Sequence, residues 1–82
     1  MTPNTRVLAV RLRLLESTRP DRIDRLERRL FARCDYNPPG GTVARRQMAA
    51  AMLTLGGTVG RCMSNLPRYW PEAARLLAEM QP

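Results

Sequence analysis

The sequence predicts a small all-α domain, a single bundle of four to five short helices over residues 1–82. Clusters of proline, glycine and small polar residues divide the chain into segments of helical length. Within these segments, apolar residues recur every three or four positions, which is the spacing of one helix face. A chain this short buries one thin core, here of Leu, Met and Ala side chains.

The first segment allows two interpretations. As a helix that begins near Pro3, it lines one face with Leu8, Leu12 and Leu15. As a strand, residues 7–14 alternate between apolar and mostly basic positions. Because leucine and arginine are good helix formers and the chain offers no second strand, we favour the helix.

The second helix follows Pro20, whose missing N–H costs nothing in a first turn. We expect Thr18 to be its N-cap and Asp21 to complete a capping box. Its apolar stripe consists of Ile23, Leu26, Leu30 and Cys34. The helix is expected to end near Asp35, before a turn rich in proline and glycine.

The third segment begins at Thr42, the expected N-cap, and is helical through Leu55. The pair Gly56–Gly57 then predicts a break, and Thr58 is placed to cap a short helix through Leu66. The alternative is one helix over residues 42–66. We favour the break, because each glycine inside a helix costs about 1 kcal/mol.

Pro71 and Glu72 are expected to open the last helix, with Trp70 just before it as an anchor in the core. The two cysteines, Cys34 and Cys62, lie far apart with no histidine in the chain. They predict two buried thiols in a reducing compartment rather than a zinc site or a redox pair.

Catalysis is not expected. The sequence has no histidine, the commonest general base near neutral pH, and no cluster of carboxylates for a metal ion. The glycine-rich stretch 56–61 lacks the strand and the Lys-Ser/Thr of a phosphate-binding loop. We therefore predict no enzyme activity, no metal and no cofactor. The apolar run 7–10 is too short for a secretory signal or a membrane span, so the cytoplasm is the expected location.

All fourteen basic residues are arginines, and seven acids leave a net charge of +7, which favours a polyanionic partner. On the second helix, Arg22, Arg25, Arg29 and Arg33 fall within one narrow arc. Arginine forks match phosphate oxygens in pairs, so this arc is a candidate phosphate-binding edge.

The chain from Tyr36 to Pro71 contains no acid. Within it, Arg45 and Arg46 stand in the first turn of their predicted helix, where exposed amides and two guanidinium groups favour an anion. Further candidates for binding the same partner are Arg11, Arg13, Arg68 and Trp70. Trp70 and its neighbour Tyr69 are placed to stack on bases, although such a pair usually packs in a core.

The strand interpretation of the first segment resembles the ribbon–helix–helix family of DNA-binding proteins over about the first 55 residues. In that family, the strands of two chains pair and enter the major groove. The resemblance implies that Ala9, Arg11 and Arg13 contact bases and that Thr42 contacts a phosphate. The Pro-Pro-Gly-Gly loop and the additional C-terminal helix depart from the family's pattern.

These observations predict a non-enzymatic, nucleic-acid-binding accessory or regulatory factor. The alternative is a helical interaction module, an adaptor or inhibitor, that docks on an acidic protein surface. Methionines at 48, 52, 63 and 80 would suit such an adaptable contact. So thin a core also favours self-association, and a homodimer is among the expected states.

Overall fold

The computed structural model describes residues 1–32 and 39–81. Within these ranges the chain forms five helices and no strand, which confirms the predicted all-α class. The helices are α1 (Pro3–Thr18), α2 (Pro20–Phe31), α3 (Gly41–Gly56), α4 (Val59–Ser64) and α5 (Leu66–Met80).

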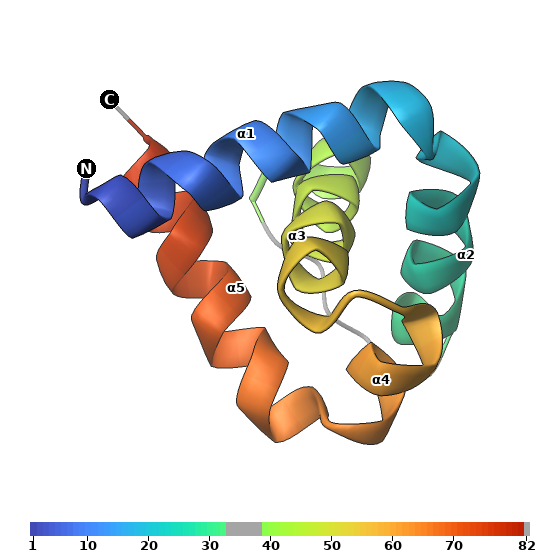
Figure 1. Ribbon diagram of the computed structural model, residues 1–82. Coiled ribbons are helices and arrows are strands. Elements are labelled where there is room, and N and C mark those ends of the chain that lie inside the picture. Colours follow the sequence, from blue (N-terminus) through green and yellow to red (C-terminus); the bar gives the residue numbers. More distant parts are fainter. Residues whose placement is uncertain (33–38, 82) are drawn as a thin grey trace.

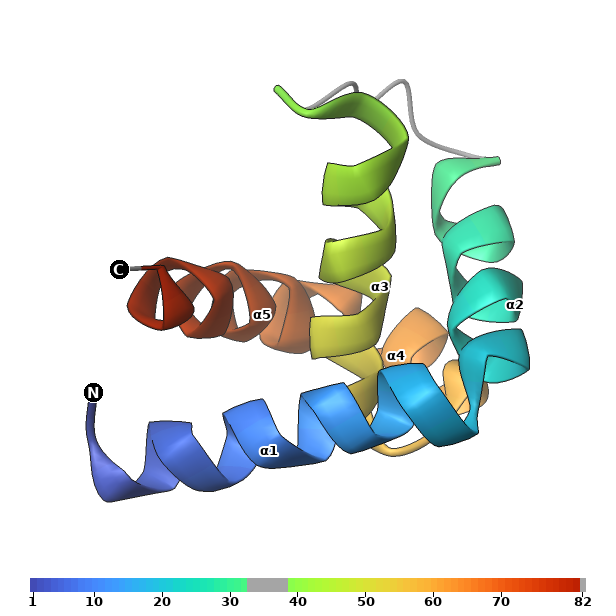
Figure 2. The ribbon, with the colours of Figure 1, turned by 90° about the horizontal axis from the view of Figure 1, so that it is seen from above.

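Helix α3 is the centre of the molecule. Figure 1 shows α3 nearly end-on, with α1, α2, α4 and α5 arranged around it. Figure 2 shows α1 and α5 lying roughly perpendicular to α3. Six consecutive α3 residues, 48–53, are buried. A helix that is apolar on all sides is typical of a core position. The alanines among them let neighbouring helices approach closely, and the core contains residues of all five helices.

The first segment is helical, as favoured from its sequence. Thr2 caps α1 by accepting a hydrogen bond from the Thr5 N–H, and Leu12 is buried against the core. The strand interpretation of residues 7–14 is therefore wrong, and with it the resemblance to ribbon–helix–helix proteins. Ala9 is buried on the inner face of α1, so it cannot contact bases.

The junction between α1 and α2 differs from the predicted capping box. Thr18 is the last residue of α1, and its hydroxyl donates to the carbonyl of Leu14 at 2.7 Å. The N-cap of α2 is Arg19, which makes no side-chain capping bond. Because the Thr18 hydroxyl is held by the preceding helix, it does not reach the amides of α2. The predicted helix end near Asp35 lies outside the described residues, as does Cys34.

Glycines set both ends of α3. The helix begins at Gly41 behind Gly40, which has φ 101°, so Thr42 lies in the first turn and is not the predicted N-cap. The predicted break is confirmed, since Gly57 with φ 85° ends α3 and Thr58 caps α4. Helix α4 stops at Ser64 rather than Leu66.

Helix α5 begins at Leu66, five residues before the predicted start at Pro71. Pro67 occupies its first turn, whereas Pro71 lies inside the helix. The early start places Tyr69 on the same face as Ala73 and Leu76, and all three are buried. Burial of this tyrosine favours the early start, although the interior position of Pro71 disfavours a helix.

Cys62 confirms part of the cysteine prediction. Its side chain is fully buried and free, and its thiol donates to the carbonyl of Met52 at 3.2 Å. Burial disfavours the thiolate and raises the pKa of the Cys62 thiol, against a smaller opposing effect of backbone hydrogen bonding at Gly56. Met48 and Met52 are also buried, and Met63 and Met80 pack against the core, so these methionines serve packing.

Candidate functional site

Three of the predicted arginines share one exposed edge of α2. Arg22, Arg25 and Arg29 project from successive turns of the helix, and all three are exposed. Within the described residues, none of them forms an ion pair. The apolar residues Ile23, Leu26 and Leu30 bury the neighbouring face and so fix the direction of this edge.

The turn between α3 and α4 lies opposite these arginines. Together they line a hollow of about 360 Å³, whose other walls are Gly57, Thr58, Val59 and Gly60. A Cβ atom added at Gly57 or Gly60 would meet no atom within 4 Å, so the backbone here borders open space. Among the described residues, the wall of this hollow contains three cationic groups and no acidic one.

A second hollow of about 420 Å³ adjoins the first and shares Gly60 with it. Arg61 of α4 and Arg68 of α5 border it, and the described part of its wall contains no acidic residue. The Arg68 guanidinium lies 5.2 Å from the centre of the Tyr69 ring, a cation–π distance that orients it. We call the surface formed by Arg22, Arg25, Arg29, Arg61 and Arg68 the basic face.

Arg45 and Arg46 lie elsewhere, on the side where α3 packs against α2. Arg46 pairs with Asp24 and lies 3.9 Å from a Glu27 oxygen. The Arg45 guanidinium covers the Phe31 ring at 5.0 Å. A hollow of about 590 Å³ on this side is lined by Asp21, Asp24, Glu27, Arg28, Phe31, Ala32 and Arg45. Because α3 begins at Gly41, Arg45 and Arg46 lie beyond its first turn, where the sequence had placed them. Acids of α2 face these two arginines, at which the sequence predicted an anion site.

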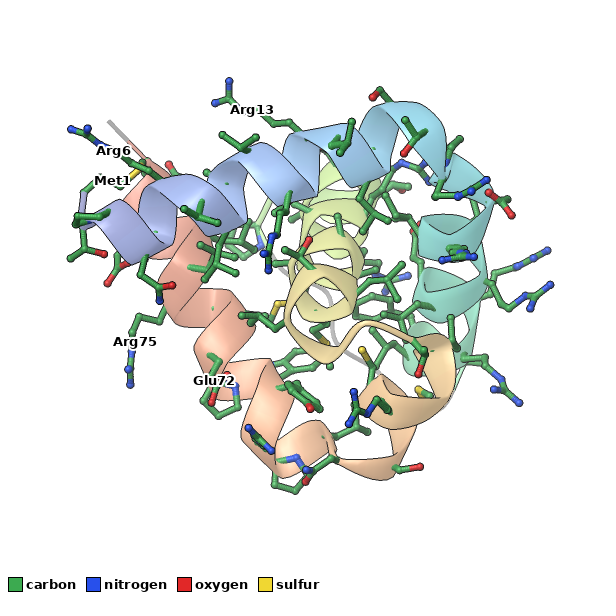
Figure 3. The ribbon with its side chains drawn as sticks, viewed as in Figure 1. Met1, Arg6, Arg13, Glu72 and Arg75 are labelled. Atoms are coloured by element: carbon green, nitrogen blue, oxygen red, sulfur yellow. The ribbon has the colours of Figure 1, made fainter. Side chains whose placement is uncertain are left out.

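The remaining predicted residues are dispersed. Arg33 lies outside the described residues. Arg11 and Arg13 are exposed on α1, and Figure 3 shows Arg13 projecting outward from that helix. Trp70 is half-buried and packs edge-on against Phe31, with 6.2 Å between ring centres. This contact supports the packing interpretation of Trp70 over the stacking of bases.

Sequence reasoning did not include Arg61 or the turn at 57–60 in the site. Two features of the sequence pointed to this part of the site: the absence of acids between Tyr36 and Pro71, and the glycine pair at 56 and 57. What could not be predicted was that the turn folds back against α2 and brings these groups beside Arg22, Arg25 and Arg29.

Over residues 1–32 and 39–81, no group of three or more His, Cys, Asp or Glu side chains is placed to hold a metal ion. No helix in these ranges is both long and apolar enough to cross a membrane. Comparisons with protein families, with curated proteins and with solved structures found no match for this chain.

Proposed function

We propose that this protein is a non-enzymatic, nucleic-acid-binding accessory or regulatory factor that contacts phosphates through the basic face. The observation that carries the proposal is the row of Arg22, Arg25 and Arg29, exposed and without ion pairs among the described residues. The row borders a hollow whose described lining residues include no acid. Arg46, by contrast, pairs with Asp24 and lies beside Glu27.

The spacing of the row suits a phosphate backbone. Arg29 lies seven positions after Arg22, which is about 10 Å along a helix at 1.5 Å per residue. Phosphates of one strand of a duplex advance about 3.4 Å per step along its axis. Three guanidinium groups therefore cover about three phosphate steps, and each can bind phosphate oxygens through two N–H groups.

Phosphate contacts alone position a protein without reading sequence. We therefore expect binding to many sequences, with an affinity that depends strongly on salt. We further propose a cytoplasmic location, in keeping with the free, buried thiol of Cys62.

The test is fluorescence anisotropy with a short labelled DNA duplex, an RNA duplex and a single strand, titrated with protein at several salt concentrations. We expect the triple variant R22A/R25A/R29A to bind roughly tenfold or more weakly at low salt. Its plot of log affinity against log salt should be less steep by about three, since each lost phosphate contact removes about 0.9 from the slope.

A second triple variant, R6A/R13A/R75A, removes the same charge at exposed positions outside the basic face and should bind nearly as the wild type does. Equal losses in the two triple variants would show a response to net charge only and would contradict the proposed face. If none of the three nucleic acids binds at low salt, the proposed function is wrong. An acidic protein surface then becomes the better candidate partner for these arginines.

A further inference from the structure

Helix α1 has a second apolar face, which points away from the core. Val7, Val10 and Leu14 are 50%, 67% and 59% exposed, whereas Leu12 on the opposite side is 4% exposed. They follow one another by three and then four residues, the spacing of the a and d positions of a coiled-coil heptad. We call Val7, Val10 and Leu14 the α1 seam.

Arginines border this seam on both sides. With Val7 and Leu14 as a positions and Val10 as d, Arg6 and Arg13 occupy the g positions and Arg11 occupies an e position. Figure 3 shows Arg6 and Arg13 projecting outward from α1. The one acid of α1, Glu16, stands at a c position, away from the seam. In coiled coils, the charges at e and g decide which partner helix is accepted.

The seam is narrow, which indicates what kind of surface it fits. A stripe confined to a and d positions is typical of a helix–helix contact. Helices that lie on membranes have a broader apolar face that carries Trp, Phe and Leu. The exposed side of α1 has no aromatic residue, and its opposite side is already packed in the core.

A second copy of this chain does not fit the seam. In a parallel pair, g positions meet the e positions of the other helix, which places Arg6 against Arg11. In an antiparallel pair, g meets g and e meets e, so Arg6 and Arg13 face each other and Arg11 faces itself. Neither orientation brings an acid of α1 to these arginines, and like charges repel.

We propose that the α1 seam docks an amphipathic helix of a partner protein that carries apolar residues at its own a and d positions and Glu or Asp at e and g. Such a helix covers Val7, Val10 and Leu14 and pairs with Arg6, Arg11 and Arg13. The fold already holds α1 as a helix, so only the partner has to form one on binding.

The test uses two synthetic peptides of about four heptads, both with Val at a and Leu at d. One has Glu at every e and g position, and the other has Lys there. Anisotropy of each labelled peptide is followed as full-length protein is added. We expect the Glu peptide to bind roughly tenfold or more tightly than the Lys peptide, because only its charges complement the three arginines.

Two variants separate the apolar and the ionic parts of the contact. V10S/L14S should weaken binding of the Glu peptide roughly tenfold or more, since it removes the apolar surface that the partner covers. R6E/R11E/R13E should reverse the preference, so that the Lys peptide binds better. All five side chains are exposed, so these changes leave the core intact. V43S, at a residue of α3 that is 66% exposed, is the matched control and should bind as the wild type does.

Three outcomes would overturn this inference. Equal binding of the two peptides would show that the arginines do not select the partner, and normal binding by V10S/L14S would reduce the contact to charge alone. Sedimentation that shows a wild-type dimer dissolved by V10S/L14S would identify a second copy as the occupant. The seam and the basic face share no residue. A negative result for one proposal therefore does not bear on the other.

Discussion

At Gly56 the end of α3 lies close against α4 and α5. A Cβ atom at this position would lie 2.7 Å from the Cys62 sulfur and 3.5 Å from the Tyr69 ring. The Cys62 side chain is fully buried, so it has little room to move away. The glycine is thus required by the close approach of two helices, in addition to its place at the end of α3.

We expect Gly56→Ala to lower the free energy of unfolding by about 1–3 kcal/mol, the usual range for overpacking a core. Urea unfolding followed by circular dichroism measures the change. Gly60→Ala is the matched control, because a Cβ there meets nothing within 4 Å, and it should leave stability unchanged or slightly raised.

A double-mutant cycle tests whether the cysteine is the cause. If Cys62 is the obstacle, C62A should recover part of the loss when it is combined with G56A, so the double variant is more stable than the sum of the two changes implies. Strict additivity would show that the strain lies elsewhere.

The buried thiol of Cys62 also makes stability depend on pH. Burial raises the pKa of this thiol above its ordinary value of about 9, so in alkaline solution the unfolded chain loses the proton before the folded chain does. The contribution of this thiol to the free energy of unfolding is therefore fully present below about pH 9. Above that pH the free energy of unfolding falls, by up to about 1.4 kcal/mol per pH unit.

Urea unfolding at pH values from neutral to alkaline measures this slope in the wild type and in C62A. The variant should show a shallower decline, since it lacks the titrating group. Equal slopes in the two proteins would contradict the role given to Cys62.

Among the helices, α5 contains a proline in its interior. Pro71 has no N–H to donate to the carbonyl four residues earlier, and its ring crowds that carbonyl. Pro67, in the first turn, removes a donor that would have no partner within the helix.

We expect Pro71→Ala to raise the free energy of unfolding by about 2 kcal/mol, which is the gain in helix propensity less the added freedom of the unfolded chain. Pro67→Ala should not raise the free energy of unfolding, because at this first-turn position the substitution only adds freedom to the unfolded chain. Thermal unfolding of the two variants measures the difference. Equal shifts of Tm in the two variants would argue against a strained interior proline.

The ends of the helices were the least predictable elements. Thr18 and Thr42 have the chemistry of N-caps, yet Thr18 belongs to the preceding helix and Thr42 to a first turn that Gly40 begins. Thr58, with the same chemistry, does cap α4. A capping residue acts only if its backbone is extended, and that depends on where the neighbouring helix stops.

At the scale of the whole molecule, the two proposed surfaces are separate. The basic face lies over α2, α4 and the start of α5, and in the described part of the chain α4 contacts α2, α3 and α5 but not α1. The α1 seam lies on the outer side of α1, which spans the molecule between α5 and α2 (Figures 1 and 2). We therefore expect R22A/R25A/R29A to retain binding of the acidic peptide and V10S/L14S to retain binding of nucleic acid.

A polar contact also joins the first helix of the molecule to the last one. The buried Thr5 hydroxyl donates to a carboxylate oxygen of Glu79, which ties the first turn of α1 to the last turn of α5. Neither residue carries a sequence signal for this pairing, because the two are separated by almost the whole chain.

The sequence by itself determined the helical class, the break at Gly56–Gly57, the burial of Cys62 and the row of arginines on α2, because helix periodicity and glycine geometry are local properties. Only the tertiary structure decided which of the described arginines have an acidic partner. The packing of α3 against α2 brings Asp24 and Glu27 to Arg46. The turn at 57–60 instead places glycine backbone and Arg61 beside the arginine row on the other edge of α2. Whether a charge is neutralised depends on which helices pack together, and contacts between distant segments cannot be predicted from local spacing.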